Sequence, residues 1–498
     1  MSNNISDITV NITVEDVVNP AVFGGMCLFD LADSAGSSNI LMPYTEVYSI
    51  DEANTAIDAS GMKEVHNNIK FDTLTGDNVT KAQLNALGDV TFLGNTYKVE
   101  NNNKTINGVQ YSTRVKAISD DNGFTVELGE NKTIGIACIG SSKGKIAAIM
   151  IKDSDDNIVF SKTVDSDTGE YISFTCTSGS DAYTVYSAST DGATICIYGI
   201  EMSSESTHAR AMKNAVQIAF TQENPPEKIG LLSCSYIDLP KYISCDWRYL
   251  IPIGITLDNF KRLAAYIEAN GEARKVLGCY FNTGQYSDLL GYLKAMKDYE
   301  RTFVYIGIPT YEGNNSIDLN QITTALISKT SNKAIGSYTY KNQALKGVYA
   351  DEAIMKSQLE EYHKNNVNGY VHKAGYDVTS EGKLVNGEYI DILDAKDWLI
   401  TQIKYQLQQV LIINDKIPYD NTGIAILEDA VVNVLKTAYN NGMIAEDDNG
   451  QPIYSVEFAK RSETKASDRE KRQYMEGKFS FDLAGAIHEA TINGTINI

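Results

Sequence analysis

Both ends of the chain alternate apolar and polar residues, which is the pattern of a β-strand with one buried face. The apolar members are Ile8, Val10, Ile12 and Val14 near the start, and Ala490, Ile492, Ile496 and Ile498 at the end. A lone strand at a terminus carries unpaired backbone groups and is unstable by itself. Two arrangements would satisfy such strands. Each could form the edge strand of a sheet in its own domain, or each could complete a sheet in a neighbouring copy of the chain.

Length and charge limit the class of protein. The chain has 498 residues, which predicts about three domains. Its net charge of -21 argues against direct nucleic-acid binding, because that function needs a basic surface. The same charge makes identical copies repel one another. Any self-assembly must therefore rest on backbone pairing, apolar contacts and local ion pairs, with salt assisting.

Nothing in the sequence predicts insertion into a membrane or export. No apolar run is long enough for a transmembrane helix. The first residues, MSNNISD, lack the basic and apolar regions of a secretory signal. The seven cysteines form no CxxC pair, which is typical of small core residues in a reducing compartment.

Three zones of different composition follow one another along the chain. The first runs to about residue 60. The second, residues 61–206, is rich in Asn, Gly, Ser, Thr and Asp and contains short alternating runs such as residues 124–128. Many short strands separated by turn residues predict a β-sandwich or jelly roll. In the third zone strand-like runs alternate with helices, which predicts an α/β arrangement.

Two helices of the third zone are predicted together with their buried faces. From Asp258 onward, the 3.6-residue spacing places Phe260, Leu263, Ala264 and Ile267 on one face. The most regular helix of the chain has an apolar face made of Leu427, Ala430, Val431, Val434, Leu435 and Ala438.

No motif points to a catalytic, metal or cofactor site. The five histidines show no metal-like spacing. The run Asp153 to Asn157 resembles the start of a calcium loop, but Ile158 stands where such a loop needs glycine. Residues 140–145 lack the spacing of a phosphate loop. We therefore predict no catalytic residue, no metal and no cofactor, although carboxylates are abundant enough to leave a catalytic pair open.

A series of short motifs in the last part of the chain resembles a known family. In order, they are residues 365–370 (NNVNGY), 387–391 (GEYID), 397–399 (DWL), 416–419 (KIPY), 441–444 (NGMI), 483–488 (LAGAIH) and 492–494 (ING). This order is similar to that of the C-terminal half of contractile bacteriophage tail sheath proteins. The helix-like residues 209–220, followed by Pro225 and Pro226, resemble an earlier helix–strand unit of that family.

The resemblance implies an α/β (α+β) sheath core with terminal exchange strands and an inserted all-β, sandwich or jelly-roll-like domain. The implied domains are an N-terminal exchange arm (1–20), an α/β sheath domain (21–60 with 207–345), the inserted domain on the outer surface (61–206) and a C-terminal helical domain with a terminal exchange strand (346–498). In this family the terminal segments pair with neighbouring subunits. That implication favours exchange for the strands containing Ile8 and Ile492.

The resemblance also implies a function. The chain would be a structural protein and not an enzyme, polymerising as rings of expected six-fold symmetry around a tail tube and contracting to drive the tube through the host envelope. The implied partners are further copies, the tail tube protein, and baseplate and tail terminator proteins. Neither nucleic acid nor a membrane is an implied partner. The implied location is the virion tail, assembled in the bacterial host cytoplasm.

Contact with the tube is the least constrained part of this interpretation. The candidates are Asp468, Arg469, Glu470, Lys471 and Arg472, which could form weak, breakable ion pairs. An ordinary solvated surface is the stronger interpretation of these residues.

Three alternatives stay open. One is the sheath of a phage-tail-like bacteriocin or contractile injection system. A second, of another class, is a carbohydrate-active enzyme or glycan-binding protein, which would need paired carboxylates or a sugar-binding surface. The third is a surface adhesin, which would need export.

Overall fold

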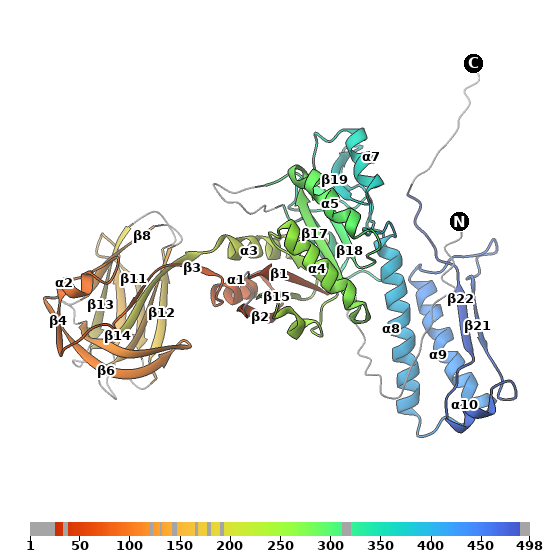
Figure 1. Ribbon diagram of the computed structural model, residues 1–498, viewed down its shortest axis with the longest axis horizontal. Helices are drawn as coiled ribbons and strands as arrows, with labels where there is room; N and C mark the ends of the chain where they lie inside the picture. The colour runs from red at the N-terminus through yellow and green to blue at the C-terminus, as the bar shows by residue number, and fades with distance from the viewer. Residues whose placement is uncertain are drawn as a thin grey trace, which may run out of the picture. The chain divides into compact units, whose positions relative to one another are not determined.

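The computed structural model describes residues 25–32, 38–118, 123–129, 132–141, 147–164, 168–176, 181–189, 194–310 and 320–488 (Figure 1). The chain divides into two compact units. The larger consists of Met1–Gly61 and Arg210–Ile498, and the smaller of Met62–Ala209.

An eight-stranded, mostly parallel sheet forms the centre of the larger unit, with strand order β2-β15-β1-β16-β17-β18-β19-β20. The strands are β1 Met26–Leu31, β2 Ile40–Val47, β15 Ile229–Cys234, β16 Tyr249–Pro252, β17 Val276–Asn282, β18 Thr302–Gly307, β19 Asn368–Lys373 and β20 Tyr376–Thr379. Only the outer pairs β2–β15 and β19–β20 are antiparallel. Every residue of β15, β16 and β18 is buried, as expected for parallel strands covered on both faces.

Helices of the larger unit pack on this sheet (Figure 1). They are α1 Ile50–Asp58, α3 Thr207–Phe220, α4 Leu257–Ala269, α5 Tyr286–Ala295, α6 Ile322–Thr330 and α7 Lys356–Lys364, with short 3-10 turns at Leu239–Tyr242, Gly271–Ala273 and Thr283–Gln285. Helix α4 begins after Thr256, whose side chain accepts a hydrogen bond from Asn259 N. The four residues predicted for its apolar face are buried. The expected mixed α/β architecture with several sheets is therefore confirmed.

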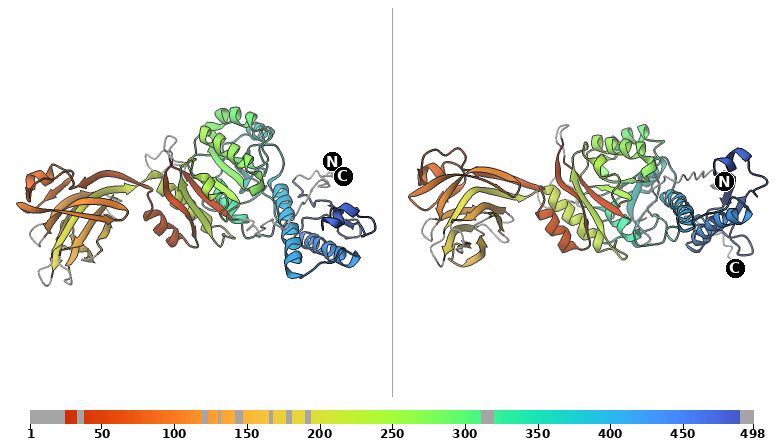
Figure 2. Two further views of the ribbon diagram at one scale, coloured as in Figure 1. Left: turned by 60° about the horizontal axis from the view of Figure 1, so that its bottom comes forward. Right: turned by 90° about the horizontal axis from the view of Figure 1, so that it is seen from below.

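Two antiparallel sheets and one short helix, α2 Lys81–Asn85, make up the smaller unit (Figure 2). One sheet has the order β11-β10-β13-β8-β5, and the other β12-β9-β14-β7-β6-β4 with β3 also paired to β14. The strands are β3 Lys63–Lys70, β4 Asn78–Thr80, β5 Val90–Phe92, β6 Thr96–Ile106, β7 Val109–Ile118, β8 Phe124–Leu128, β9 Lys132–Gly140, β10 Ala147–Lys152, β11 Ile158–Val164, β12 Glu170–Thr175, β13 Asp181–Ser189 and β14 Ile195–Glu205.

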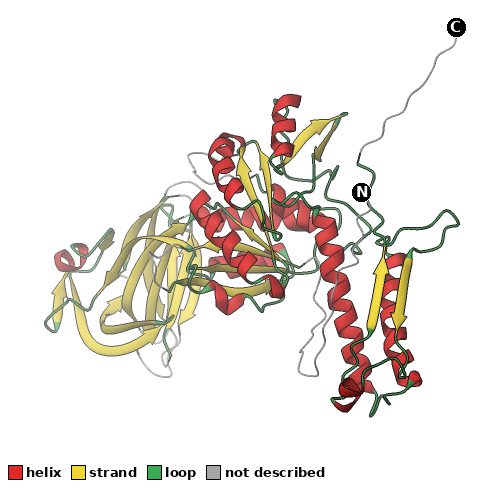
Figure 3. Ribbon diagram, turned by 45° about the vertical axis from the view of Figure 1, so that its right-hand side comes forward, coloured by secondary structure: helices red, strands yellow, loops and turns green. Residues whose placement is uncertain are grey.

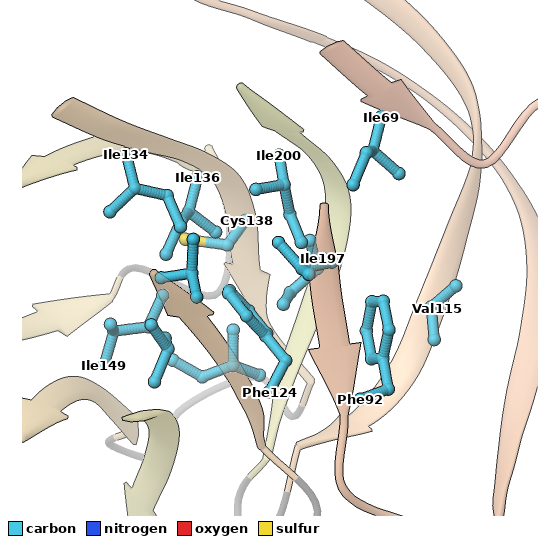
Figure 4. Close-up of a cluster of buried hydrophobic side chains, with 14 of the residues drawn as sticks. Ile69, Phe92, Val115, Phe124, Ile134, Ile136, Cys138, Ile149, Ile197 and Ile200 are labelled. Atoms are coloured by element: carbon cyan, nitrogen blue, oxygen red, sulfur yellow. The ribbon is translucent and has the colours of Figure 1, made fainter. Parts of the chain in front are cut away.

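Both sheets contribute side chains to one apolar core (Figure 4). Phe124 and Ile149 come from the smaller sheet, and Ile136 and Ile197 from the larger one. The first and last strands of the unit, β3 and β14, pair with each other. The two ends of the unit therefore lie side by side, which is what insertion into another domain requires.

The C-terminal part of the larger unit is a helical hairpin that carries a small sheet (Figure 3). Its elements are α8 Ile390–Ile413, α9 Asn421–Asn440, β21 Tyr454–Phe458, α10 Ala466–Glu470 and β22 Gly477–Phe481. Helix α9 begins after Asp420, whose carboxylate accepts hydrogen bonds from Thr422 N and Gly423 N. Leu399 and Ile403 of α8 share a core with Val434 and Leu435 of α9.

Candidate assembly site

Strands β21 and β22 form a two-stranded antiparallel sheet, and within the described residues neither pairs with a third strand. One face is apolar and packs on the core shared by α8 and α9 (Figure 3); its members are Tyr454, Val456, Phe458, Phe479 and Phe481. The opposite face is polar, with the hydroxyl oxygens of Ser455 and Ser480 2.8 Å apart. A two-stranded sheet is marginally stable by itself, so this one depends on the helices beneath it.

Backbone hydrogen bonds at both ends of the hairpin define which groups face outward. Asp482 N donates to Ile453 O at 3.0 Å, and Ala459 N donates to Glu476 O at 3.3 Å. Because bonded and non-bonded pairs alternate in an antiparallel ladder, the N–H and C=O groups of Val456 point away from β22. By the same alternation, those of Phe479 point away from β21. Each long edge of the sheet thus presents outward-facing groups that no described strand pairs with and that a further strand could bind.

Several other sheet edges are less suited to accept a strand. In the eight-stranded sheet, β2 contains Pro43 and shifts register against β15, and β20 has four residues. In the smaller unit, β4 and β5 have three residues each. Strands β11 and β12 are longer, but an ion pair of 2.9 Å between Lys162 and Glu170 ties these two edges together. Proline, short length and charge all protect an edge from pairing.

A buried ion-pair network fixes α8 to the eight-stranded sheet. Arg248, next to β16, donates from Nη2 to Asp394 Oδ1 at 2.6 Å and from Nη1 to Asp397 Oδ2 at 2.9 Å. The exposed fractions of these three residues are 4%, 1% and 2%. Arg301, next to β18, donates to both oxygens of Asp397 at 2.8 and 3.0 Å. The helix that carries the small sheet is therefore attached to the body by fully desolvated charges.

The charges in this network depend on one another. Burial raises the pKa of the Asp397 carboxyl, but the guanidinium groups of Arg248 and Arg301 outweigh burial and lower it overall. Burial alone would lower the pKa of Arg248, but the carboxylates of Asp394 and Asp397 raise it. Asp394 also accepts hydrogen bonds of 2.7 Å from the hydroxyls of Tyr249 and Tyr340.

The predicted exchange strands lie outside the described residues. They comprise residues 8–14 at the start of the chain and 490–498 at its end. The last described residue, His488, lies against the ring of Tyr389 with ring centroids 4.9 Å apart, and its Nε2 is 3.2 Å from Thr339 Oγ1.

The structure places Asp468, Arg469, Glu470, Lys471 and Arg472 in and just after α10, within the connection between β21 and β22. Arg469 serves this connection itself, because its Nη1 donates to Thr464 Oγ1 at 3.1 Å and to Arg461 O at 3.3 Å. Glu470, Lys471 and Arg472 are exposed. None of these three forms an ion pair with another described residue.

Sequence reasoning missed two features of this region. The hairpin strands are short, and the only available signal was the alternation in residues 454–458 (YSVEF) and 478–481 (KFSF). The network around Arg248 was missed as well; its carboxylates Asp394 and Asp397 stand three residues apart on α8, and both are buried. No three His, Cys, Asp or Glu side chains of the described residues could hold a metal ion together. No helix in the described ranges has the length and apolar character needed to cross a membrane.

Residues 390–496 match the family described as "E217 tail sheath protein gp31-like, C-terminal domain". The matched range begins at α8 and contains the hairpin β21–β22. The resemblance to tail sheath proteins, drawn from short motifs, is confirmed by this match. No curated protein sequence matches the chain.

Several solved sheath structures are similar to the chain at low identity. The sheath tail protein of Desulfitobacterium hafniense is 12% identical, with 90% of this chain and 93% of that one covered and a TM-score of 0.40. The sheath tail protein of Listeria innocua is 10% identical, with 87% and 88% covered and a TM-score of 0.40. The contracted PVC sheath of an extracellular contractile injection system is 11% identical, with 58% and 81% covered and a TM-score of 0.46. Similarities at this level assign no function to the chain.

Proposed function

We propose that this chain, which carries a tail sheath C-terminal domain over residues 390–496, is the repeating subunit of a contractile phage tail sheath. It polymerises around the tail tube and contracts to drive the tube through the host envelope. The observation that carries the proposal is the two-stranded sheet β21–β22, which lies inside the matched range and pairs with no further strand of the described residues on either edge. A sheath of a phage-tail-like bacteriocin or injection system would use the same subunit in the same way.

In this proposal, terminal strands of neighbouring copies add to the two edges of β21–β22. As a strand, residues 8–14 would place their apolar members on one face, and this face would continue the apolar face formed by Val456 and Phe479. Each backbone hydrogen bond contributes about 1 kcal/mol net, and the apolar face adds about 25 cal/mol per Å² buried. The strand at residues 490–498 would serve a second neighbour. Such a contact joins two different surfaces, so it propagates as a ring or helix instead of closing as a dimer.

Contraction then works by rigid-body motion. The added strands stay paired while the bodies of the subunits rotate about the chain segments that connect strands and body. The buried pairs from Arg248 to Asp394 and Asp397 support this view, because they hold α8 to the eight-stranded sheet. The sheath performs work by exchanging one set of contacts between bodies for a more favourable set.

The remaining assignments belong to the same proposal. Residues 61–206 are an insertion on the outer surface, residues 1–20 are the N-terminal arm, and residues 346–498 are the C-terminal domain. Residues 21–60 and 207–345 form the α/β sheath domain. Of the candidates for tube contact, the exposed residues Glu470, Lys471 and Arg472 can offer breakable ion pairs. Baseplate and tail terminator proteins are the proposed partners at the sheath ends. The protein is structural and resides in the virion tail after assembly in the host cytoplasm.

A glycan-binding role is not favoured by the smaller unit. Its tyrosines Tyr111 and Tyr198 lie on the sheet face opposite the main core, but they are 6% and 0% exposed and so offer no ring face to a sugar. The large apolar side chains exposed in the described part of this unit are aliphatic. We therefore propose no second function.

The test compares the two faces of the N-terminal strand. One variant replaces Ile8, Val10, Ile12 and Val14 with serine, and its matched control replaces Thr9, Asn11 and Thr13 with serine. Electron microscopy with tube protein present should reveal sheaths for the wild type and the control. The first variant should stay a folded monomer with an unchanged circular dichroism spectrum, as should a deletion of the residues before Glu15. Normal sheaths from the deletion variant would refute strand addition.

A further inference from the structure

The C-terminal end of α8 presents an exposed apolar surface. Leu411, Ile412 and Ile413, here called the apolar cap, are 41%, 72% and 75% exposed. Up to Ile403 the helix has a buried face, but none of its later residues is buried. Figure 1 shows this end of α8 projecting beyond the eight-stranded sheet. Consecutive aliphatic residues at a helix end that the described part of the chain leaves this exposed indicate an interface.

The cap lies in an uncharged stretch that is flanked by Lys404 on one side and by Asp415 and Lys416 on the other. Ten residues, 405–414, carry no charge in a chain that is 21% charged. The connection between β21 and β22 adjoins the loop after α8, because Tyr419 Oη donates to Gln473 O and Arg461 N donates to Asn421 Oδ1, both at 3.0 Å. This connection brings the exposed residues Lys460, Arg461, Glu463 and Lys465, three basic and one acidic, to the same end of the domain. An apolar centre with a charged rim is the usual anatomy of a protein interface.

We propose that the apolar cap docks on a second copy of this chain, an inference that rests on the proposed sheath function. Each copy carries a net charge of -21, so two copies approach most easily where one of them is uncharged or basic. The cap and its rim, formed by Lys460, Arg461 and Lys465, meet that condition. The acidic surface of the neighbour is complementary to the rim.

The need for release also favours a second copy over the tube. A sheath that contracts around a tube must give up its contacts with the tube, whereas copies of the subunit stay joined. Exposed Leu411, Ile412 and Ile413 gain from permanent burial, and a contact that must break is better made by weak, solvated ion pairs. The tube contact proposed for Glu470, Lys471 and Arg472 is a separate contact of the same subunit.

The first test replaces Ile412 and Ile413 with glutamate. The matched control replaces Ile158 and Val159 of β11, which are also consecutive, aliphatic and exposed at 53% and 43%, and it changes the charge equally. We expect the control to polymerise like the wild type and the cap variant to need a roughly tenfold or higher protein concentration, the ratio that corresponds to about 1.4 kcal/mol. Equal critical concentrations for the two variants would overturn the proposal while leaving the sheath function intact.

The second test identifies the occupant directly. A photo-crosslinking residue at position 412 is activated in assembled sheaths, and the linked peptides are identified by mass spectrometry. We expect links to another copy of this chain. Links to the tube protein alone, or only within one copy, would contradict the proposal. A wild-type chain that forms no sheaths with its tube protein would instead overturn the proposed function, and this inference with it.

Discussion

Replacing Arg248 with methionine is expected to destabilise the larger unit by about 3–5 kcal/mol, the usual cost of leaving a buried charge without its partner. The residue that loses its cationic partner is Asp394. It would keep its hydrogen bonds from Tyr249 and Tyr340 but would have no cationic partner in the described part of the chain. Asp397 would be less affected, because Arg301 still pairs with both of its oxygens.

The assay is differential scanning calorimetry of the monomeric chain. At about 2.1 cal/mol/K of unfolding entropy per residue, 3–5 kcal/mol in a unit of roughly 350 residues corresponds to a fall in melting temperature of about 4–7 °C. The separate core of Met62–Ala209 should unfold in its own transition and serve as an internal reference. Arg262→Met is the matched control, because Arg262 is exposed and surface substitutions usually change stability by less than about 0.5 kcal/mol.

A second substitution separates a charge effect from loss of packing. Adding Asp394→Asn to Arg248→Met removes the unpaired carboxylate, so the double variant should be more stable than Arg248→Met alone by about 1 kcal/mol or more. If the two substitutions simply add their costs, the network does not act through charge compensation and this reasoning is wrong.

Two further predictions concern single residues of the larger unit. Burial raises the pKa of Asp391 from 3.8 to about 6, so ionisation of this carboxyl destabilises the fold above that pH. Asp391→Asn should therefore raise the melting temperature at pH 7.5. The gain in melting temperature should shrink as the pH falls from 6 to 4. Thermal melts of both proteins between pH 4 and 7.5 check this prediction. A gain in melting temperature that does not depend on pH would contradict the raised pKa of Asp391. A Cβ at Gly423 would lie 1.9 Å from Pro418 O, so Gly423→Ala should cost about 1–3 kcal/mol. Gly291→Ala on α5, where a Cβ meets nothing within 4 Å, should stabilise the fold by about 0.4–1 kcal/mol. In urea denaturation, the changes in unfolding free energy of the two glycine variants should have opposite signs. Equal changes would refute the steric argument.

Periodicity predicted the long regular elements because burial along them repeats with the backbone. All four residues proposed for the apolar face of α4 are buried. In α9, Ala430, Val431, Val434, Leu435 and Ala438 are buried, and Leu427 is half-buried. The alternating run at residues 124–128 became β8 with the same bounds.

The missed elements depend on weaker or more distant signals. The hairpin β6–β7 was overlooked because Asn101, Asn102 and Asn103 have low strand propensity. Its turn could nevertheless have been predicted, because Asn-Gly is a preferred sequence for a two-residue hairpin turn. In the structure Asn107 and Gly108 have the positive φ values, 50° and 76°, that such a turn requires. No local pattern could predict the pairing of Arg248 with Asp394, because 146 positions separate them.

The assembly site itself was only half predictable. Alternation in residues 8–14 and 490–498 predicts strands that could be donated, and this stays a prediction; no pattern pointed to the sheet proposed to receive them. The receiving strands have five residues each, and the connection between them holds a further helix. A strand of that length is a weak signal, and pairing across such a connection is decided by packing on α8 and α9.

Amide hydrogen exchange at single-residue resolution in β21 tests strand addition most directly. In the monomer, the amides of Ser455 and Glu457 face β22 and should be protected, whereas those of Val456 and Phe458 face outward and should exchange rapidly. In assembled sheaths the outward amides should become protected as well, so that the alternation disappears. Rapid exchange at Val456 and Phe458 in sheaths as in monomers would mean that no strand from a neighbour binds this edge.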